Sequence, residues 1–154
     1  MSGNMQTAPE VEYVTAMIGG QLFGLPIERV LDVFKPERLT RVPLAAAEIA
    51  GVLNLRGRIV TAIDMRIRLD LPPRTSAEKF MAIGIEHGGE SYGLLVDQVG
   101  EVLKLPAARL DTVPANLDPS WARLAAGVHR LDDRLMVVLD VDRSLDFQTE
   151  TAAA

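Results

Sequence analysis

The fold of this chain is decided by one stretch near its middle: Gly51-Val52-Leu53-Asn54-Leu55-Arg56-Gly57-Arg58-Ile59-Val60-Thr61-Ala62-Ile63-Asp64. Two short apolar runs flank the residues Asn54-Leu55-Arg56-Gly57, a pattern typical of two strands joined by a tight turn. A weaker copy follows at Gly127-Val128-His129-Arg130-Leu131-Asp132-Asp133-Arg134-Leu135-Met136-Val137-Val138-Leu139-Asp140. The chain therefore uses one small β unit twice. Only the first copy has an Arg-Gly turn, and we expect function to lie in that difference.

The repeat extends beyond these hairpins. Gly24–Val33 resembles Gly93–Val102 in the spacing of its apolar residues, and a Gly-Gly turn precedes each segment. We expect two halves, 11–70 and 79–147, each with about five strands and tight turns. Because closure hides the edges of small sheets, the predicted fold is all-β with short helices, built as two five-stranded β-barrels of duplicated plan. Leu71–Ser76 is the expected linker, and the sequence leaves open whether strands cross between the halves.

Gly, Pro and Asp residues mark the expected boundaries of the individual elements. The first strands are predicted at Tyr13–Ile18, Gln21–Leu25 and Ile27–Phe34, the last with Val30 and Val33 buried. Two short helices are predicted from Pro and Gly in capping positions, Leu44–Ala50 after Pro43 and before Gly51, and Ser120–Ala126 after Asp118-Pro119 and before Gly127.

Composition limits the class of protein. The 154 residues are 48% apolar, which is typical of a folded domain, and the aromatic fraction of 5% predicts a core of Val, Leu, Ile and Ala. The net charge of -5 weighs against general binding to nucleic-acid backbones. The chain contains no cysteine, no signal-like leader and no apolar run long enough to span a membrane, so we expect a cytoplasmic protein. Residues 1–10 and 148–154 are expected to be a flexible leader and tail.

Residues that could carry chemistry are few. The two histidines, His87 and His129, are far apart in the sequence, and neither has the companions that a zinc site requires. No serine stands in the context of a nucleophile elbow, and the Gly-Gly pairs are placed as hairpin turns rather than phosphate-binding loops. We therefore predict a protein that is not an enzyme and that has no cofactor and no metal.

Arginines cluster in and after the first hairpin, at Arg56, Arg58, Arg66 and Arg68. A solvated sheet face is the ordinary explanation for such a cluster, and a recognition patch is the alternative. Arg56 favours the second, because an arginine in a turn beside a glycine projects freely and can anchor an interface. Trp121, the only tryptophan, is expected to fill the core from a short helix.

These residues resemble a known family. The segment Gly51–Val60 together with Ile63-Asp64-Met65-Arg66 is similar to the signature of the CheW family of chemotaxis coupling proteins. The resemblance extends over Val11–Phe147 and includes Gly24-Leu25-Pro26-Ile27, Thr40-Arg41-Val42-Pro43 and Gly93-Leu94-Leu95-Val96-Asp97. The chain has Ala62 where the family usually has proline, which affects local strand geometry and leaves the turn unchanged.

The resemblance implies two SH3-like barrels with an apolar seam and a non-enzymatic adaptor. Such an adaptor links the cytoplasmic tips of chemoreceptors (methyl-accepting chemotaxis proteins) to the regulatory domain of the histidine kinase CheA, in membrane-associated arrays that can include further copies of the adaptor. Carried over by position, the receptor-binding residues are Val30, Gly51, Arg56 and Ile59, and the kinase-binding residues are Ile27, Leu31 and Asp32.

A second class of function competes with this one. Related small barrels bind single-stranded nucleic acid, which requires aromatic platforms and a basic groove. Tyr13, Phe23, Phe80 and Tyr92 fall mostly in predicted strand cores, so this alternative is the weaker. The chain is also too short to hold a kinase catalytic domain or a receiver domain, and we expect it to act as a standalone protein.

Overall fold

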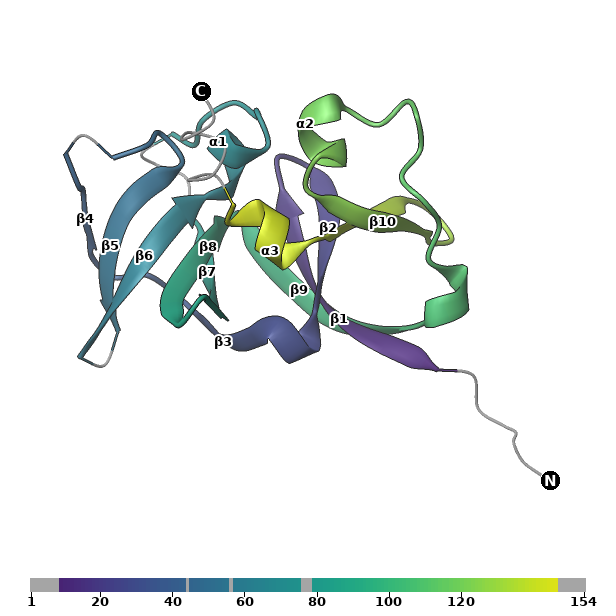
Figure 1. Ribbon diagram of the computed structural model, residues 1–154, viewed down its shortest axis with the longest axis horizontal. Coiled ribbons are helices and arrows are strands. Elements are labelled where there is room, and N and C mark those ends of the chain that lie inside the picture. The colour runs from purple at the N-terminus through teal and green to yellow at the C-terminus, as the bar shows by residue number, and fades with distance from the viewer. Residues whose placement is uncertain (1–8, 44, 56, 76–78, 147–154) are drawn as a thin grey trace.

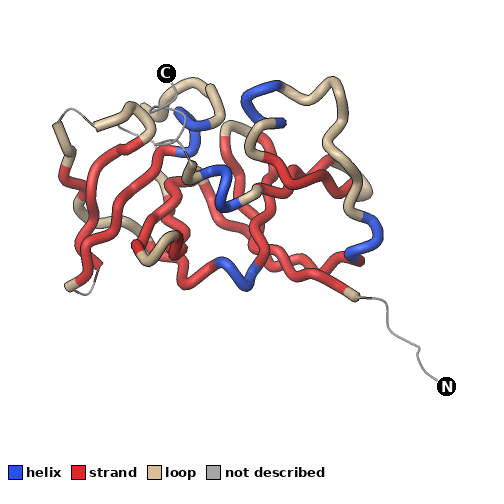
Figure 2. The backbone as a smooth tube through the Cα atoms, in the orientation of Figure 1, coloured by secondary structure: helices blue, strands red, loops and turns tan. Residues whose placement is uncertain are grey.

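Two β-sheets lie side by side in this computed structural model, which describes residues 9–43, 45–55, 57–75 and 79–146 (Figures 1 and 2). The first sheet has the strand order β10-β11-β2-β1-β9, and the second has the order β3-β7-β8-β6-β5-β4. The prediction of a mostly β fold with short helices is confirmed. The second sheet has six strands rather than five, because Leu39–Thr40 forms an additional short strand against β5.

Each sheet combines strands from both halves of the chain. The first contains β1 (Glu10–Ile18), β2 (Gln21–Pro26), β9 (Gln98–Pro106), β10 (Ala125–Arg130) and β11 (Leu135–Leu139). The second contains β3 (Val30–Phe34), β4 (Leu39–Thr40), β5 (Ile49–Leu55), β6 (Arg58–Asp64), β7 (Met81–His87) and β8 (Glu90–Val96). The described residues also form two 3-10 turns and three one-turn helices: Ile27–Arg29, Ala107–Arg109, α1 (Met65–Arg68), α2 (Pro119–Ala122) and α3 (Val141–Ser144).

The crossing that the sequence left open is an exchange of hairpins. The hairpin β1–β2 pairs with β9 and β11 from the second half of the chain. The hairpin β7–β8 pairs in the same way with β3 and β6 from the first half. In each sheet the outer contact is antiparallel and the inner one is parallel, so the two sheets follow one plan.

The registers of the two sheets agree residue by residue. Ala16 pairs with Val99 in the first sheet, and Ile85 pairs with Val30 at the equivalent point of the second. Both pairings contain a bulge at that point, where the ladder shifts by one residue. The helices after β6 and β11 also correspond, because Asp64 and Asp140 cap α1 and α3 by accepting backbone N–H groups.

Three local predictions need correction. Ile27–Arg29 forms a 3-10 turn rather than the start of a strand, and Val33 is exposed because its side chain points to the outer face of β3. No helix occupies the described part of 44–50, since β5 begins at Ile49. The second predicted helix forms, but α2 ends at Ala122 because its residues give way to β10, and Gly127 lies inside that strand.

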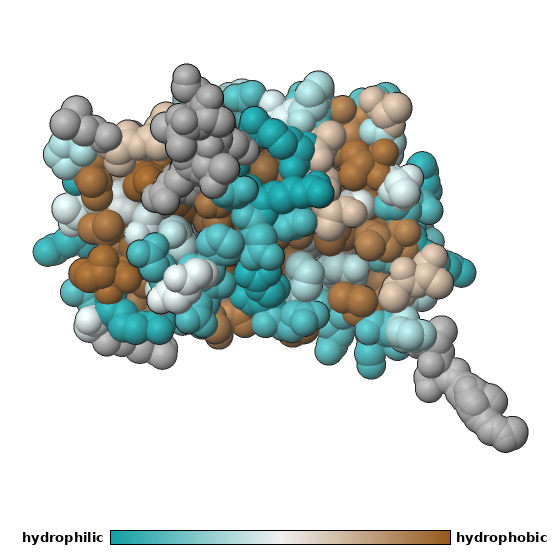
Figure 3. Space-filling model, in the orientation of Figure 1, coloured by the Kyte–Doolittle hydropathy of each residue, from teal (hydrophilic) through white to brown (hydrophobic). Residues whose placement is uncertain are grey.

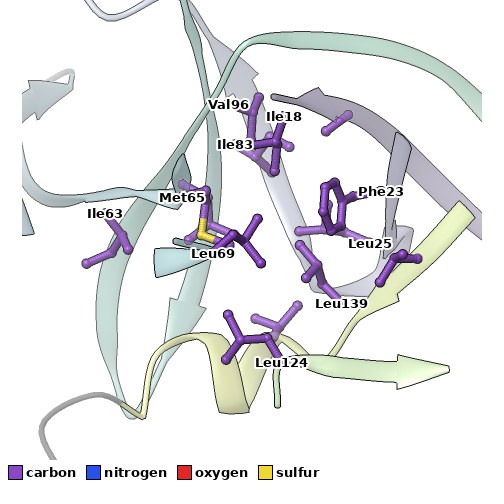
Figure 4. Close-up of a cluster of buried hydrophobic side chains, with 14 of the residues drawn as sticks. Ile18, Phe23, Leu25, Ile63, Met65, Leu69, Ile83, Val96, Leu124 and Leu139 are labelled. Carbon is purple, nitrogen blue, oxygen red and sulfur yellow. The ribbon is translucent and has the colours of Figure 1, made fainter. Parts of the chain in front are cut away.

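One continuous apolar core joins the two sheets (Figure 4). Ile18, Phe23 and Leu25 from the first sheet meet Ile63 and Ile83 from the second, and all are fully buried. Burial on this scale stabilises the fold at about 25 cal/mol for each Å² of apolar surface removed from water. The sheets are therefore parts of one folding unit, and neither could keep its core without the other.

Polar contacts between the chain halves are made at the ends of the helices. The Arg68 side chain is only 2% exposed, and it donates hydrogen bonds to the backbone carbonyls of Arg143 and Ser144 at the end of α3. Trp121 packs edge-to-face on Phe23 and donates its indole N–H to the carbonyl of Leu69, which confirms its expected role in the core. A cation at the last carbonyls of a helix is favourable, so these contacts hold α3 across the seam.

Asp97, between β8 and β9, joins four segments of the chain. Its carboxylate accepts hydrogen bonds from Arg66 of α1 at 2.8 and 2.9 Å, from Arg74 at 2.9 Å and from the backbone N–H of Gly19 at 2.8 Å. Burial acts to raise the pKa of Asp97, but the hydrogen bonds from Arg66, Gly19 and Arg74 outweigh it and lower the pKa from 3.8 to about 2. Asp97 therefore links the first hairpin turn to the second sheet in its charged form.

Replacing Asp97 tests this link. Because the folded-state pKa lies below the ordinary value, the charged carboxylate stabilises the fold above about pH 4, and this contribution is lost as the pH falls toward 2. We expect Asp97→Asn to lower the free energy of unfolding at pH 7 by about 2 kcal/mol or more, since two arginines also lose a partner. Urea unfolding measures the effect, and the difference from the wild type should shrink at acid pH.

The matched control is Asp133→Asn, in the exposed turn after β10. The Asp133 side chain is 81% exposed and stands 3.8 Å from Arg134, so its loss should change stability by less than about 0.5 kcal/mol. Equal losses in the two variants would contradict the assigned role of Asp97.

Candidate functional site

The strand β3 and the 3-10 turn before it carry four of the seven residues predicted to bind partners, and β3 is an edge strand of the second sheet. Leu31 and Val33 are 53% and 39% exposed on its outer face, and Ile27 in the preceding turn is 39% exposed. Large exposed apolar side chains along an unpaired sheet edge are costly in water unless a partner covers them. These three residues form what we call the β3 edge.

Asp32 lies on the opposite face of β3 from Leu31, because side chains alternate along a strand. Its carboxylate lies directly over Gly84 of β7, where the Cβ atom of any larger residue would collide with it. A shallow depression at this point is lined by Leu31, Asp32, Leu55 and Arg58. The structure therefore places the predicted kinase-binding residues on neighbouring parts of one sheet, with Asp32 turned away from Ile27 and Leu31.

The predicted receptor-binding residues are spread over three strands of the second sheet. Ile59 on β6 is 63% exposed, whereas Val30 on β3 is half-buried against the core. In the turn between β5 and β6, Asn54 Oδ1 accepts the backbone N–H of Gly57, an arrangement that stabilises a tight turn. Arg56 lies outside the described residues.

Gly51 differs from the other receptor-binding candidates because it is buried within β5. Its φ is +151°, and a Cβ atom there would collide with the backbone carbonyl of Thr40 in β4. Gly127 stands at the equivalent point of β10, where a Cβ atom would lie 2.6 Å from the carbonyl oxygen of Asp111. Both glycines allow a neighbouring backbone segment to cross closely, so the structure gives Gly51 a packing role common to both sheets.

The seam between the sheets carries two ion pairs in which the equivalent helix residues have opposite charge. On one side Arg66 of α1 contacts Asp97 at 2.8 Å; on the other Asp142 of α3 contacts Arg29 at 2.9 Å. The hydrogen bond from Arg29 lowers the pKa of Asp142, and the contact with His87 at 3.1 Å adds to this effect. Hydrophilic residues gather over the middle of the face that shows α3, with apolar surface on both sides (Figure 3).

The Arg66 side of the seam also holds a cavity of about 700 Å³. Its lining includes Lys35, Lys79, Phe80, Met81 and Val99 beside the Arg66–Asp97 pair. A cavity with apolar walls and cationic side chains is a binding feature that the sequence did not predict, because its residues come from four separate segments.

Neither histidine lies in a setting that favours catalysis. His129 is 2% exposed beside Tyr13, and burial lowers its pKa, so its ring is neutral at pH 7. His87 contacts an exposed aspartate at the molecular surface. Within the described parts of the chain, no group of three or more His, Cys, Asp or Glu residues could hold a metal ion.

The model of the CheW-like domain family matches residues 12–148. The chain belongs to this family. Similar chains include the chemotaxis protein CheW of Helicobacter pylori, 27% identical over 135 residues (88% of this chain and 81% of that protein), and that of Bacillus subtilis, 24% identical over 153 residues (99% and 97%). The structure also resembles the scaffolding protein TtCheW of Thermoanaerobacter tengcongensis, with a TM-score of 0.79, 26% identity and coverage of 90% of this chain and 94% of that one.

This CheW-like chain has no helix, in its described residues, that is long and apolar enough to cross a membrane.

The ionic network around Asp97 is the main feature of this CheW-like domain that sequence reasoning missed. The sequence predicts one basic cluster that includes Arg58, Arg66 and Arg68, but Arg66 and Arg68 are turned inward, and of these three only Arg58 is exposed. The available signal was the capping aspartate Asp64, which begins a helix and so ends the strand alternation on which the grouping depended.

A pair of glycine substitutions tests the packing role of Gly51 in this CheW-like domain. We expect Gly51→Ala to lower the free energy of unfolding by about 3 kcal/mol, because the new Cβ atom collides with backbone. Gly57→Ala should cost only about 1 kcal/mol, because its φ is +84° and nothing lies within 4 Å of the added atom. Thermal unfolding measures both, and equal losses would contradict the packing role of Gly51.

Proposed function

We propose that this protein is a chemosensory adaptor that joins the cytoplasmic tips of chemoreceptors to the histidine kinase CheA. Its membership of the CheW-like family supports this, as do relatives named as chemotaxis proteins and a similar structure named as a scaffolding protein. The observation that carries the proposal is the exposed apolar surface of one sheet: the β3 edge and Ile59 present separate anchors on a shared rigid core.

The receptor contact is assigned to the surface around the β5–β6 hairpin. A receptor tip is a helical bundle, and an apolar stripe on a helix can cover Ile59 while Val30 supports the wall beneath. Arg56 would add a charged contact to a receptor carboxylate or to helix C-terminal carbonyls. Gly51 contributes by allowing β4 to pack against β5 and so shaping this surface.

The kinase contact is assigned to the β3 edge. Ile27 and Leu31 provide exposed apolar area, and the edge offers unpaired backbone groups to a partner. Asp32 acts from the other face of the strand, where it shares a depression with Arg58. The two proposed contacts therefore adjoin at this depression, and we expect receptor and kinase to bind close to each other.

An adaptor of this kind works by binding and without catalysis, in the cytoplasm beside the receptor arrays. Modest interfaces suffice, because many weak contacts act together in an array. The nucleic-acid alternative is not favoured, because Tyr13 and Phe23 are 2% and 0% exposed and cannot serve as base-stacking platforms.

Substitutions at the hairpin test the receptor contact. We expect Ile59→Asp and Arg56→Glu each to weaken binding to a receptor cytoplasmic fragment at least about tenfold, with no change in melting temperature. Val42→Asp is the matched control, because Val42 is 42% exposed just after β4 of the same sheet and has no assigned role. Sedimentation with receptor-containing membranes measures binding, and undiminished binding of both hairpin variants would disprove the assignment.

The β3 edge is tested in the same way with the kinase. Leu31→Asp should weaken binding to the regulatory domain of CheA by about tenfold or more while receptor binding changes less than about threefold. Leu110→Asp provides the control, because Leu110 is 38% exposed near the other sheet. Titration calorimetry distinguishes the outcomes, and a larger loss of receptor binding than of kinase binding would show that the two contacts are exchanged.

A further inference from the structure

The cavity beside Arg66 carries an excess of positive charge. Asp97 is the anion among its lining residues, and that carboxylate is already bound by Arg66 and Arg74. Lys35 and Lys79 are both exposed and form no ion pair with any residue that the structure describes. The lining also provides apolar area from Phe80, Met81 and Val99. We call this cavity the cationic corner.

The equivalent corner of the duplicated fold has the opposite charge. The agreement of the two strand registers relates Lys35 to Lys104, Lys79 to Glu10 and Met81 to Glu12. The repeat likewise relates Arg66 to Asp142 and Asp97 to Glu28, and Asp142 pairs with Arg29, the residue after Glu28. This second corner therefore carries four carboxylates against two cations: Glu10, Glu12, Glu28 and Asp142 against Arg29 and Lys104.

The lysines of the two corners are not needed for folding. The Lys104 side chain is 63% exposed and stands 4.0 Å from Glu10, so this pair adds little to stability. Lys35 and Lys79 have no such pairing at all among the described residues, and cations that stabilise nothing inside the chain are available to a partner. A concave surface lined by cations concentrates their field and so attracts a carboxylate more strongly than a flat surface with the same charges.

We propose that the cationic corner receives an acidic segment of the receptor tip, carboxylates beside an apolar side chain, and that the charge reversal between the two corners fixes the direction in which the receptor binds. This inference rests on the proposed adaptor function. Two corners of equal charge would accept the receptor in two orientations related by the internal repeat. With opposite charges, one orientation is attracted and the reverse brings carboxylates to Glu10 and Glu12, where like charges repel.

The test uses the full-length protein and a purified receptor cytoplasmic fragment from the same organism. We expect the double variant Lys35→Glu/Lys79→Glu to weaken binding at least about tenfold at low salt and to flatten the dependence of affinity on NaCl. Lys104→Glu is the matched control: it makes the same change at the equivalent position of the other sheet and should alter affinity less than about twofold. Because all three lysines are exposed, the melting temperatures should not change.

A charge-reversed receptor fragment, with lysines in place of the acidic residues at its tip, should recover binding to the double variant and lose binding to the wild type. Equal affinity of the double variant and the wild type for the native fragment would overturn the role of the corner while leaving the adaptor function intact. If the wild type also bound single-stranded oligo-dT, and the double variant lost this binding together with receptor binding, the corner would be a general anion site. That result would also overturn the proposal. If the wild type bound neither receptor nor kinase, both the adaptor function and this inference would be wrong.

Discussion

The structure depends on an exchange of strand partners between the two Gly-Gly hairpins. Each hairpin, β1–β2 or β7–β8, pairs with the strand that follows the other hairpin. β1 needs β9 and β7 needs β3, so neither half of the chain can complete a sheet from its own residues. The exchange also forces the core to be shared, because Ile18 and Phe23 meet Ile63 and Ile83 across the seam. Two sheets joined only by a linker would move independently. Here the exchanged hairpins and common core hold them in one geometry, which an adaptor needs if it is to place two partners at a fixed separation.

Hairpins could be predicted from the sequence because their signals are local. The Gly-Gly turns and the Asn54–Gly57 turn lie between alternating apolar runs, and each hairpin formed where expected. The exchange could not be predicted, because pairing such as that of β2 with β11 depends on register between strands more than 100 residues apart, and no local pattern records it. The false helix at 44–50 has a clear cause: Gly51 matched a helix cap, but its actual requirement is the close approach of Thr40.

The candidate site was predictable to a similar extent. Exposed apolar residues on β3 and β6 follow from strand alternation, and Leu31 and Ile59 lie on the surface as a contact residue must. The same alternation places Asp32 on the opposite face from Leu31, a consequence that grouping residues by family position overlooks. The cavity beside Arg66 could not be found from sequence at all. Its cations come from the residue after β3, from α1 and from the second residue before β7, and only the exchanged topology brings them together.

Comparison of the two equivalent halves separates what the fold requires from what it leaves free. The glycines at Gly51 and Gly127 and the capping aspartates Asp64 and Asp140 are the same in both copies, because each satisfies a backbone constraint that the shared plan imposes twice. The helix residue at the seam keeps its position and reverses its charge, Arg66 in α1 and Asp142 in α3, and each finds a partner of opposite charge nearby. A duplicated fold with identical surfaces would present its partner with two equal docking directions. Surface charges can change at little cost in stability, and a difference in charge between the two copies removes that ambiguity. We therefore attribute the direction of binding to the surface residues that differ between the copies.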